Sequence, residues 1–273
     1  MDEDIRLELP RHAYYARLPE LALFANGGFP FSRFADGAGM AFVLPDSPNN
    51  EDIAATLTVA GFLGATTGAV LNRAGVLPER AVGADTTLDL LYVGGAERLQ
   101  AASDEQLGLP LHFDENDVTL RDIGTLAQLS GRMRGTDYLE AHSYAARVVH
   151  DAGNRLGAIM AAESTFTDGA SVLVVTAGNN GSVLDTARLL LEAGTRQFIR
   201  GGLTLSDREE VSGYTLGPDY AVGSLPWDWA LQRWIAERPW MVFILLPLAA
   251  LIAVWALRAA LRNRAQRRLK GDA

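Results

Sequence analysis

Three loops carry the glycines, amides and hydroxyls that most often hold a ligand in an α/β protein. They are residues 46–50 (Asp-Ser-Pro-Asn-Asn), Gly94-Gly95 and 177–182 (Ala-Gly-Asn-Asn-Gly-Ser). Ligands of open parallel sheets bind beyond the carboxyl ends of the strands, so a phosphate would bind here. The third loop could offer backbone amides to an anion, but it lacks a P-loop lysine and the full G-x-G-x-x-G spacing. We therefore favour a turn that caps the following helix.

The first loop is unsuited to a phosphate because it is acidic. Asp46, Glu51 and Asp52 place negative charge where a phosphate needs amides and hydroxyls, and this charge already complements the positive start of a helix. We therefore expect no bound FMN and no other cofactor.

Other catalytic or metal-binding patterns are missing from the sequence. There are no cysteines, no H-E-x-x-H and no G-x-S-x-G, and the spacing of His142 and His150 suits two turns of one helix better than metal ligation. We expect no catalytic residue and no metal site. Arg258–Arg262 and Arg264–Arg268 match an R-x-x-x-R pattern that can clamp a cyclic dinucleotide, but neither is accompanied by D-x-S-x-x-G.

The elements that must position these loops alternate between strands and helices. Strands are predicted at 40–44, 69–74, 88–93, 156–163 and 171–176, and helices at 52–68, 96–106, 138–152 and 182–193. The helix at 52–68 should keep Ile53, Leu57, Ala60 and either Leu63 or Gly64 on a common side. Residues 109–123 resemble a small hairpin, and 195–222 return to β character. The alternation predicts a mostly parallel, doubly wound sheet.

The charge of the chain is unevenly distributed. The net formal charge is −9, yet residues 258–273 carry +5 and the rest −14. A body this acidic argues against a nucleic-acid partner, because binding a polyanion needs basic residues facing the phosphates.

Residues 239–258 predict a transmembrane helix. The segment from Pro239 to Leu257 is uncharged, and at about 1.5 Å per residue it nearly matches a hydrocarbon core of roughly 30 Å. Trp240 and Trp255 sit near its ends like interfacial anchors, and Pro247 makes a kink plausible. The alternative is a buried core helix, which the missing amphipathic stripe and the basic flank disfavour.

The basic residues after this segment predict its orientation. Lys and Arg residues that flank a membrane span favour its cytoplasmic side, so these arginines should set the topology, with residues 259–273 in the cytoplasm and the body outside. The arginines are Arg258, Arg262, Arg264, Arg267 and Arg268. The acidic start of the chain shows no signal peptide. Two interpretations stay open: the chain is part of a longer precursor, or it is a tail-anchored cytosolic protein.

Residues 224–238 predict an amphipathic helix that lies in the lipid interface. Trp227, Leu231, Trp234 and Ile235 recur at helical spacing and share one face. The lipid bilayer is then a partner. The alternative is a helix packed on the soluble domain.

Three segments resemble the B subunit of bacterial cellulose synthase. They are residues 15–33 (YARLPELALFANGGFPFSR), 42–46 (FVLPD) and 220–227 (YAVGSLPW) with the tryptophan-rich segment that follows. The resemblance covers nearly the whole chain. It implies a flavodoxin-like domain at 36–205, a β-type connector at 206–223, and a lead-in at 1–35 that includes a remnant of a preceding carbohydrate-binding domain.

The resemblance also implies a function. The chain would be a non-catalytic, periplasmic accessory subunit at the inner membrane, supporting the catalytic subunit in cyclic di-GMP-activated cellulose synthesis and glucan export. Its partners would be that glycosyltransferase and the nascent glucan, with the cyclic di-GMP site in the catalytic partner. The alternative is a membrane-tethered α/β enzyme or nucleotide-binding protein with its site near Asp46, Gly94 and Asn179.

Overall fold

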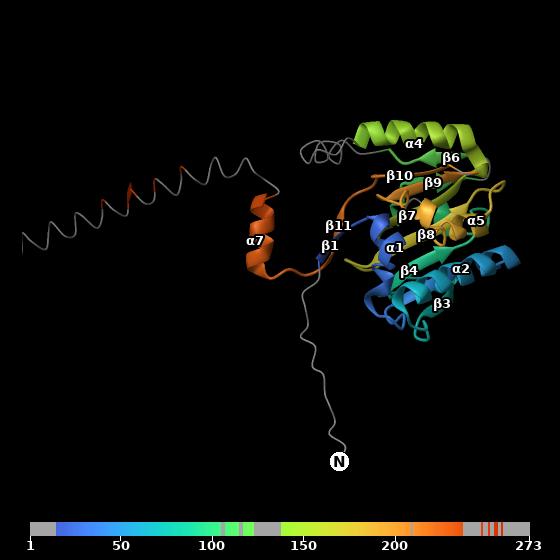
Figure 1. Cartoon of the computed structure of the whole chain (residues 1–273), viewed down its shortest axis with the longest axis horizontal. Coiled ribbons are helices and arrows are strands. Elements are labelled where there is room, and N and C mark those ends of the chain that lie inside the picture. The colour runs from blue at the N-terminus through green and yellow to red at the C-terminus, as the bar shows by residue number, and fades with distance from the viewer. Residues whose placement is uncertain are drawn as a thin grey trace, which may run out of the picture. The chain divides into compact units, whose positions relative to one another are not determined.

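The computed structural model describes residues 15–104, 107–114, 117–122, 138–208 and 210–236, together with five single positions from Pro247 to Arg258. The chain divides into two compact units. One is Tyr15–Gly223, and the other joins Met1–Tyr14 to Ser224–Ala273. Figure 1 shows that the first unit is built around a twisted sheet with helices on both faces.

The sheet of the first unit has seven strands in the order β10-β9-β7-β8-β4-β2-β3. In chain order the strands are β2 (Met40–Leu44), β3 (Gly75–Pro78), β4 (Asp89–Val93), β7 (Gly157–Glu163), β8 (Ser171–Ala177), β9 (Leu203–Asp207) and β10 (Glu210–Tyr214). Strands β3, β2, β4 and β8 are parallel, whereas β7 is antiparallel to both of its neighbours and β10 is antiparallel to β9.

This mixed sheet shows that the predicted doubly wound, flavodoxin-like architecture is wrong. Strands β7 and β8 are separated only by residues 164–170, and a parallel crossover needs about a dozen residues or more. The short link forces a hairpin. A second tight turn joins β9 to β10 and puts Arg208 at a φ of 56°, as two-residue hairpin turns require.

Helices cover the two faces of the sheet separately (Figure 1). They are α1 (Leu21–Gly27), α2 (Asn50–Thr67), α4 (Tyr138–Ala152), α5 (Val183–Arg188) and α6 (Ala193–Arg196). Along β4, Leu90 and Tyr92 join the core beneath α4, and Leu91 and Val93 join the core beneath α1, α2 and α5. This alternation places apolar layers on both faces of the sheet.

Helix α2 lies within two residues of the predicted bounds at each end, but most of the face that it buries is different. Asn49 caps its first turn and Gly68 ends it in the left-handed conformation. Ile53 and Leu57 of the predicted face are 43% and 67% exposed, and only Leu63 of that set is buried, together with Val59 and Phe62. The helix is apolar on all sides, so spacing alone could not identify the buried face.

Several other element boundaries differ from the prediction. Residues 69–74 form a turn, and the edge strand β3 starts at Gly75. The helix predicted at 96–106 is only a 3-10 turn, Gln100–Ala102, within the described residues. The helix predicted at 182–193 is shorter, because α5 ends at Arg188 and α6 begins only at Ala193. The hairpin at 109–123 is confirmed as β5 (Leu111–Phe113) and β6 (Val118–Leu120).

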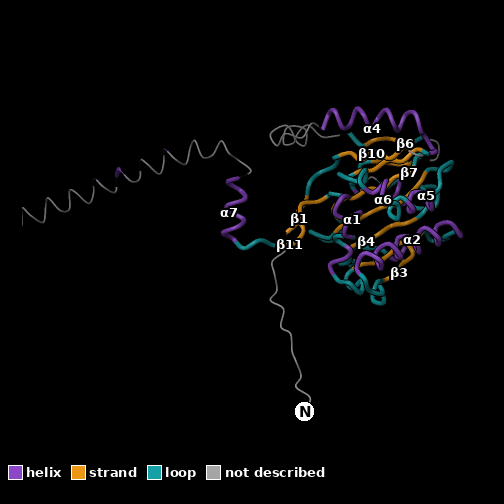
Figure 2. Tube along the Cα trace, viewed as in Figure 1, coloured by secondary structure: helices purple, strands orange, loops and turns teal. Residues whose placement is uncertain are grey.

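A second, two-stranded sheet pairs β1 (Tyr15–Leu18) with β11 (Tyr220–Gly223), which Figure 2 shows side by side. A buried polar chain ties it to the main sheet. The Tyr220 hydroxyl donates to Ser171 Oγ at 2.8 Å, and the Ser171 amide donates to Asp89 Oδ1 at 2.8 Å. Asp89 also pairs with Arg33. Burial raises the pKa of the Asp89 carboxyl and outweighs the lowering by the Ser171 amide and the Arg33 guanidinium.

The described part of the second unit is helix α7 (Trp227–Ala236) and the five single positions. Within the described residues, no helix combines the length and apolarity that crossing a membrane requires. The fold therefore does not support the predicted transmembrane helix. Most of its range, 239–258, lies outside the described residues.

We predict that Tyr220→Phe lowers the free energy of unfolding by about 1–2 kcal/mol, because it leaves the buried Ser171 hydroxyl without this donor. Urea denaturation measures the change. Tyr144→Phe is the matched control, since Tyr144 is 49% exposed. Equal stability of the two variants would show that the polar chain does not hold β11 to the main sheet.

Candidate functional site

The three loops singled out from the sequence meet at one corner of the sheet. A small cavity of about 120 Å³ lies there, lined by Asn49 and Glu51, by Gly95, and by residues 177–179 and 181. These residues follow β2, β4 and β8, which are parallel. The corner therefore has the position of a ligand site in an open α/β sheet, but little space.

The buried carboxylate of Asp52 fills the base of this corner. Its Oδ2 accepts from the Asn49 amide at 2.9 Å while Asn49 Oδ1 accepts from the Asp52 amide at 2.9 Å, which makes a capping box at the start of α2. Its Oδ1 accepts from the Gly95 amide at 2.9 Å. One carboxylate thus joins the loops after β2 and β4.

Arg98 completes the environment of this carboxylate. Its Nε and Nη2 lie 2.8 and 3.0 Å from Asp52 Oδ2 and Oδ1, a two-point ion pair. Burial raises the pKa of the Asp52 carboxyl, but the Arg98 guanidinium and the amides of Asn49 and Gly95 outweigh it and lower that pKa below its ordinary value. The pair is ionised at neutral pH, and its hydrogen-bonding atoms face one another rather than a ligand.

The start of α5 at the same corner also faces a carboxylate of the protein. Glu51 Oε1 accepts from Ser182 Oγ at 2.6 Å and from the Leu184 amide at 3.4 Å. Ser182 in turn caps α5 by accepting from the Asp185 amide. The turn-and-cap interpretation of residues 177–182 is therefore confirmed. An incoming phosphate would meet the negative charge of Glu51.

Two further residues of the predicted loops are used in packing. A Cβ on Gly94 would lie 2.6 Å from Pro45 Cγ, so this glycine allows the two loops to approach closely. Asp46 accepts from the Arg80 amide at 3.0 Å and so holds the start of the segment after β3. Among the described residues, no group of three or more His, Asp or Glu is arranged to hold a metal ion.

The predicted anchor residues belong to the second unit. On α7, Trp227 and Leu231 are 80% and 49% exposed, as is Trp229 at 64%. Trp234 and Ile235 lie within α7, but their side chains fall outside the described part. Pro247, Trp255 and Arg258 occupy helical positions. Trp240 and the arginines at 262, 264, 267 and 268 lie outside the described residues.

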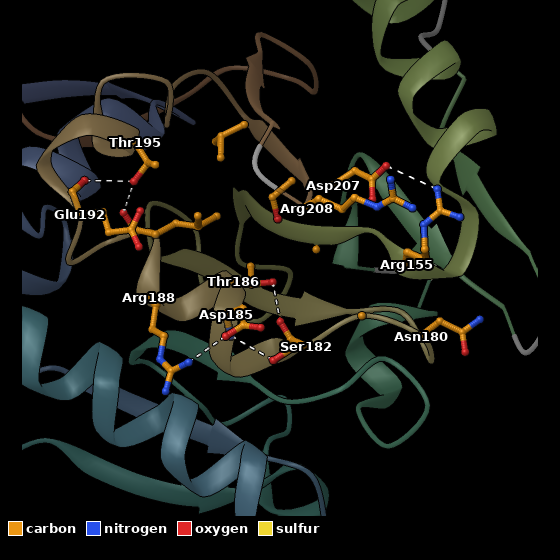
Figure 3. Close-up of a pocket in the computed structure, with 15 residues that line it drawn as sticks. Arg155, Asn180, Ser182, Asp185, Thr186, Arg188, Glu192, Thr195, Asp207 and Arg208 are labelled. Atoms are coloured by element: carbon orange, nitrogen blue, oxygen red, sulfur yellow. Dashed lines mark hydrogen bonds and ion pairs between the residues drawn. The ribbon is translucent and has the colours of Figure 1, made fainter.

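Sequence reasoning missed a second cavity of about 820 Å³ at the same edge of the sheet (Figure 3). It lies between α5, the loop after β8 and the β9–β10 turn. The signals that could have located it were the glycine at the start of β7, Gly157, and the non-glycine residue in a tight turn, Arg208. Neither Gly157 nor Arg208 belongs to a recognisable sequence motif.

Comparison with known proteins assigns the chain to a family. Residues 14–175 match the family described as "Cellulose synthase BcsB, second FD domain". The chain is 28% identical over 278 residues to "Cellulose synthase 1" of Komagataeibacter xylinus, covering 99% of this chain and 18% of that protein.

Two further relatives are "Cyclic di-GMP-binding protein" of Xanthomonas axonopodis pv. citri (strain 306) and of Escherichia coli (strain K12). The identities are 28% over 275 residues and 25% over 276 residues, covering 98% and 99% of this chain and 34% of each relative. The chain thus spans at most about a third of the length of these relatives. It belongs to the cellulose synthase BcsB family, through the second FD domain of that subunit.

Proposed function

We propose that the chain acts as a non-catalytic accessory part of a bacterial cellulose synthase, supporting the catalytic subunit in glucan synthesis and export. The observation that carries this proposal is the match of residues 14–175 to the second FD domain of the cellulose synthase subunit BcsB. Similarity to a relative named cellulose synthase over 99% of the chain supports it.

The geometry of the predicted corner supports a role without catalysis. Asp52 and Arg98 satisfy each other, Glu51 occupies the start of α5, and the remaining space is about 120 Å³. No nucleophile and base are brought together there. A flavin or nucleotide phosphate would have to displace both carboxylates, so the alternative of an enzyme near Asp46, Gly94 and Asn179 is not favoured.

Two relatives are named for binding cyclic di-GMP. We propose that this chain contributes to the cyclic di-GMP-activated complex through its contacts with the catalytic subunit. The acidic body is a poor surface for a dinucleotide, since its residues outside 258–273 carry a net charge of −14. Accordingly, we assign no nucleotide ligand to residues of this chain.

We further propose that the chain works at the inner membrane with its body in the periplasm. The arginine-rich residues 258–268 favour the cytoplasmic side and anionic lipid, and the exposed Trp227, Trp229 and Leu231 of α7 suit the lipid interface or a membrane-protein partner. Here α7 is the contact element.

The function is tested by affinity purification of the full chain from cells that make cellulose. We expect a processive glycosyltransferase to co-purify, and depletion of the chain to lower glucan synthesis in membrane vesicles at least about tenfold. Trp227→Ala with Trp229→Ala should weaken co-purification, because large aromatic side chains dominate contact energies. Tyr144→Ala with Phe34→Ala, two exposed aromatic residues of the first unit, is the matched control. Full synthesis without the chain would refute the proposal.

The location is tested by protease added to spheroplasts. We expect digestion within residues 15–223 and protection of an epitope at Ala273, because basic segments stay on the cytoplasmic side. Fragments are identified by immunoblotting, with a cytoplasmic enzyme as the intactness control. A protected body in otherwise permeable cells would place it in the cytoplasm.

A further inference from the structure

The cavity of about 820 Å³ lies at the end of the sheet where β8 and β9 finish and β7 begins (Figure 3). Both β8 and β9 are antiparallel to β7 and so run in the same direction. The cavity therefore occupies the carboxyl-end edge of the sheet, and Gly181 lines both this cavity and the smaller one of about 120 Å³. Its volume falls within the range of roughly 300–1,000 Å³ that is usual for ligand sites.

A glycine keeps the floor of this cavity open. A Cβ on Gly157 would lie 2.2 Å from Thr186 Oγ1 and 2.5 Å from Ser206 Oγ, distances that real Cβ atoms do not show. Only glycine at the start of β7 lets hydroxyls from α5 and β9 converge over the strand. The floor is thus lined by hydroxyl groups.

The walls carry balanced charge. The lining contains three positively charged and three negatively charged side chains. They are Arg155, Arg188, Arg208, Asp185, Glu192 and Asp207. Two of the arginines have partners within the set. Arg155 Nη2 lies 3.5 Å from Asp207 Oδ2, and Arg188 Nη1 lies 2.9 Å from Asp185 Oδ1, as the dashed lines in Figure 3 show. The formal charge of the lining is therefore zero.

One acceptor in the wall is unused. Asp207 Oδ1 is buried and has no hydrogen-bond partner among the described residues, although Oδ2 of the same carboxylate faces Arg155. Oδ1 itself is covered by protein, whereas the Asp207 side chain as a whole is 26% exposed, so a ligand would contact this carboxylate through Oδ2, beside Arg155. An ionised carboxylate oxygen accepts several hydrogen bonds, so Asp207 suits a ligand that donates them.

These features select among ligand classes. A polyanion would meet three carboxylates, which removes the electrostatic gain that such ligands need. A protein partner would find no aromatic anchor, since the described residues lining the cavity include only Leu189 and Val211 as large apolar side chains. A neutral polyol both donates and accepts along its whole length, and the lining offers guanidinium donors, carboxylate acceptors and hydroxyls that do both.

We infer that this cavity binds a short segment of a neutral oligosaccharide, which within the proposed function is the β-glucan made by the synthase. The identity of the sugar rests on that proposed function, whereas the class of ligand rests on the cavity. Without an aromatic face for stacking, the affinity is expected on the order of 1 mM, weak enough for a moving chain to pass.

The test is nuclear magnetic resonance of the full chain labelled at glycine with ¹⁵N and titrated with cellohexaose. Gly157 and Gly181 line the cavity, and Gly68 and Gly83 lie away from it as internal references. We expect saturable shifts of the first two amide signals and none of the references. Inorganic phosphate is the second probe and should shift neither.

Paired variants localise the binding. Arg208→Gln with Glu192→Gln removes two exposed charges of the lining and should weaken cellohexaose binding at least about tenfold, the effect of losing roughly one hydrogen bond to a charged group. Arg80→Gln with Asp85→Asn makes the same charge change at exposed positions elsewhere and should leave the affinity unchanged. The glycine spectrum of each variant reports whether it is folded.

Two results would overturn the inference: no shift of Gly157 and Gly181 at 10-fold the expected dissociation constant, or a shift with phosphate alone. Either result would leave the proposed function standing if the glycosyltransferase still co-purified. Conversely, cellohexaose binding with no glycosyltransferase would retain the oligosaccharide site and remove the synthase assignment.

Discussion

The first unit depends on the hydrogen bonds and the ion pair that the Asp52 carboxylate makes. It closes the capping box with Asn49, accepts the Gly95 amide from the loop after β4, and holds Arg98 at two points. The side chain is fully buried. An ionised group in such a position is stable only if every oxygen is paired, so helix α2, the end of β4 and the 95–98 turn are fixed together.

This constraint determines where the molecule has space. The corner that would hold a phosphate in many α/β proteins is occupied by the Asp52–Arg98 pair and by Glu51 at the start of α5. The antiparallel β7 opens a second place at the same edge, because the strand begins with Gly157 and its neighbours end in Ala177 and Asp207. The proposed non-catalytic role is consistent with the corner that the Asp52–Arg98 pair occupies. The proposed contact with a polymer is consistent with the open cavity at Gly157.

Much of the fold could be predicted from the sequence, because its local signals are strong. The apolar runs at β2, β4, β7 and β8 and the helix at 138–152 follow from composition and spacing. The strand direction was predicted wrongly because the alternation of elements was weighed above the short link at 164–170. That link was readable in the sequence, and its length alone excludes a crossover helix.

The candidate site could be predicted only in part. The three loops were identified because strand ends and glycines mark them, and the acidic residues 51 and 52 do lie at helix starts there, where each accepts hydrogen bonds from backbone amides. The role of Arg98 was not foreseen, since it is 46 residues from Asp52 and a helix was expected around it. Long-range pairs of this kind, and the cavity over Gly157, depend on packing that no local pattern records.

The central claim is that Asp52 and Arg98 are coupled and fix this corner, and a double-mutant cycle in urea measures it. Asp52→Asn should lower the free energy of unfolding by about 2–3 kcal/mol, and the cycle with Arg98→Gln should give a coupling of about 1 kcal/mol or more. The exposed pair Asp36 and Arg73 is the control and should show no measurable coupling. Because the pKa of Asp52 is lowered in the folded protein, its contribution is present above the unfolded pKa of about 4 and disappears as the pH falls through the folded value. The account predicts a large coupling that is lost in acid, whereas additive effects of the two substitutions at neutral pH would contradict it.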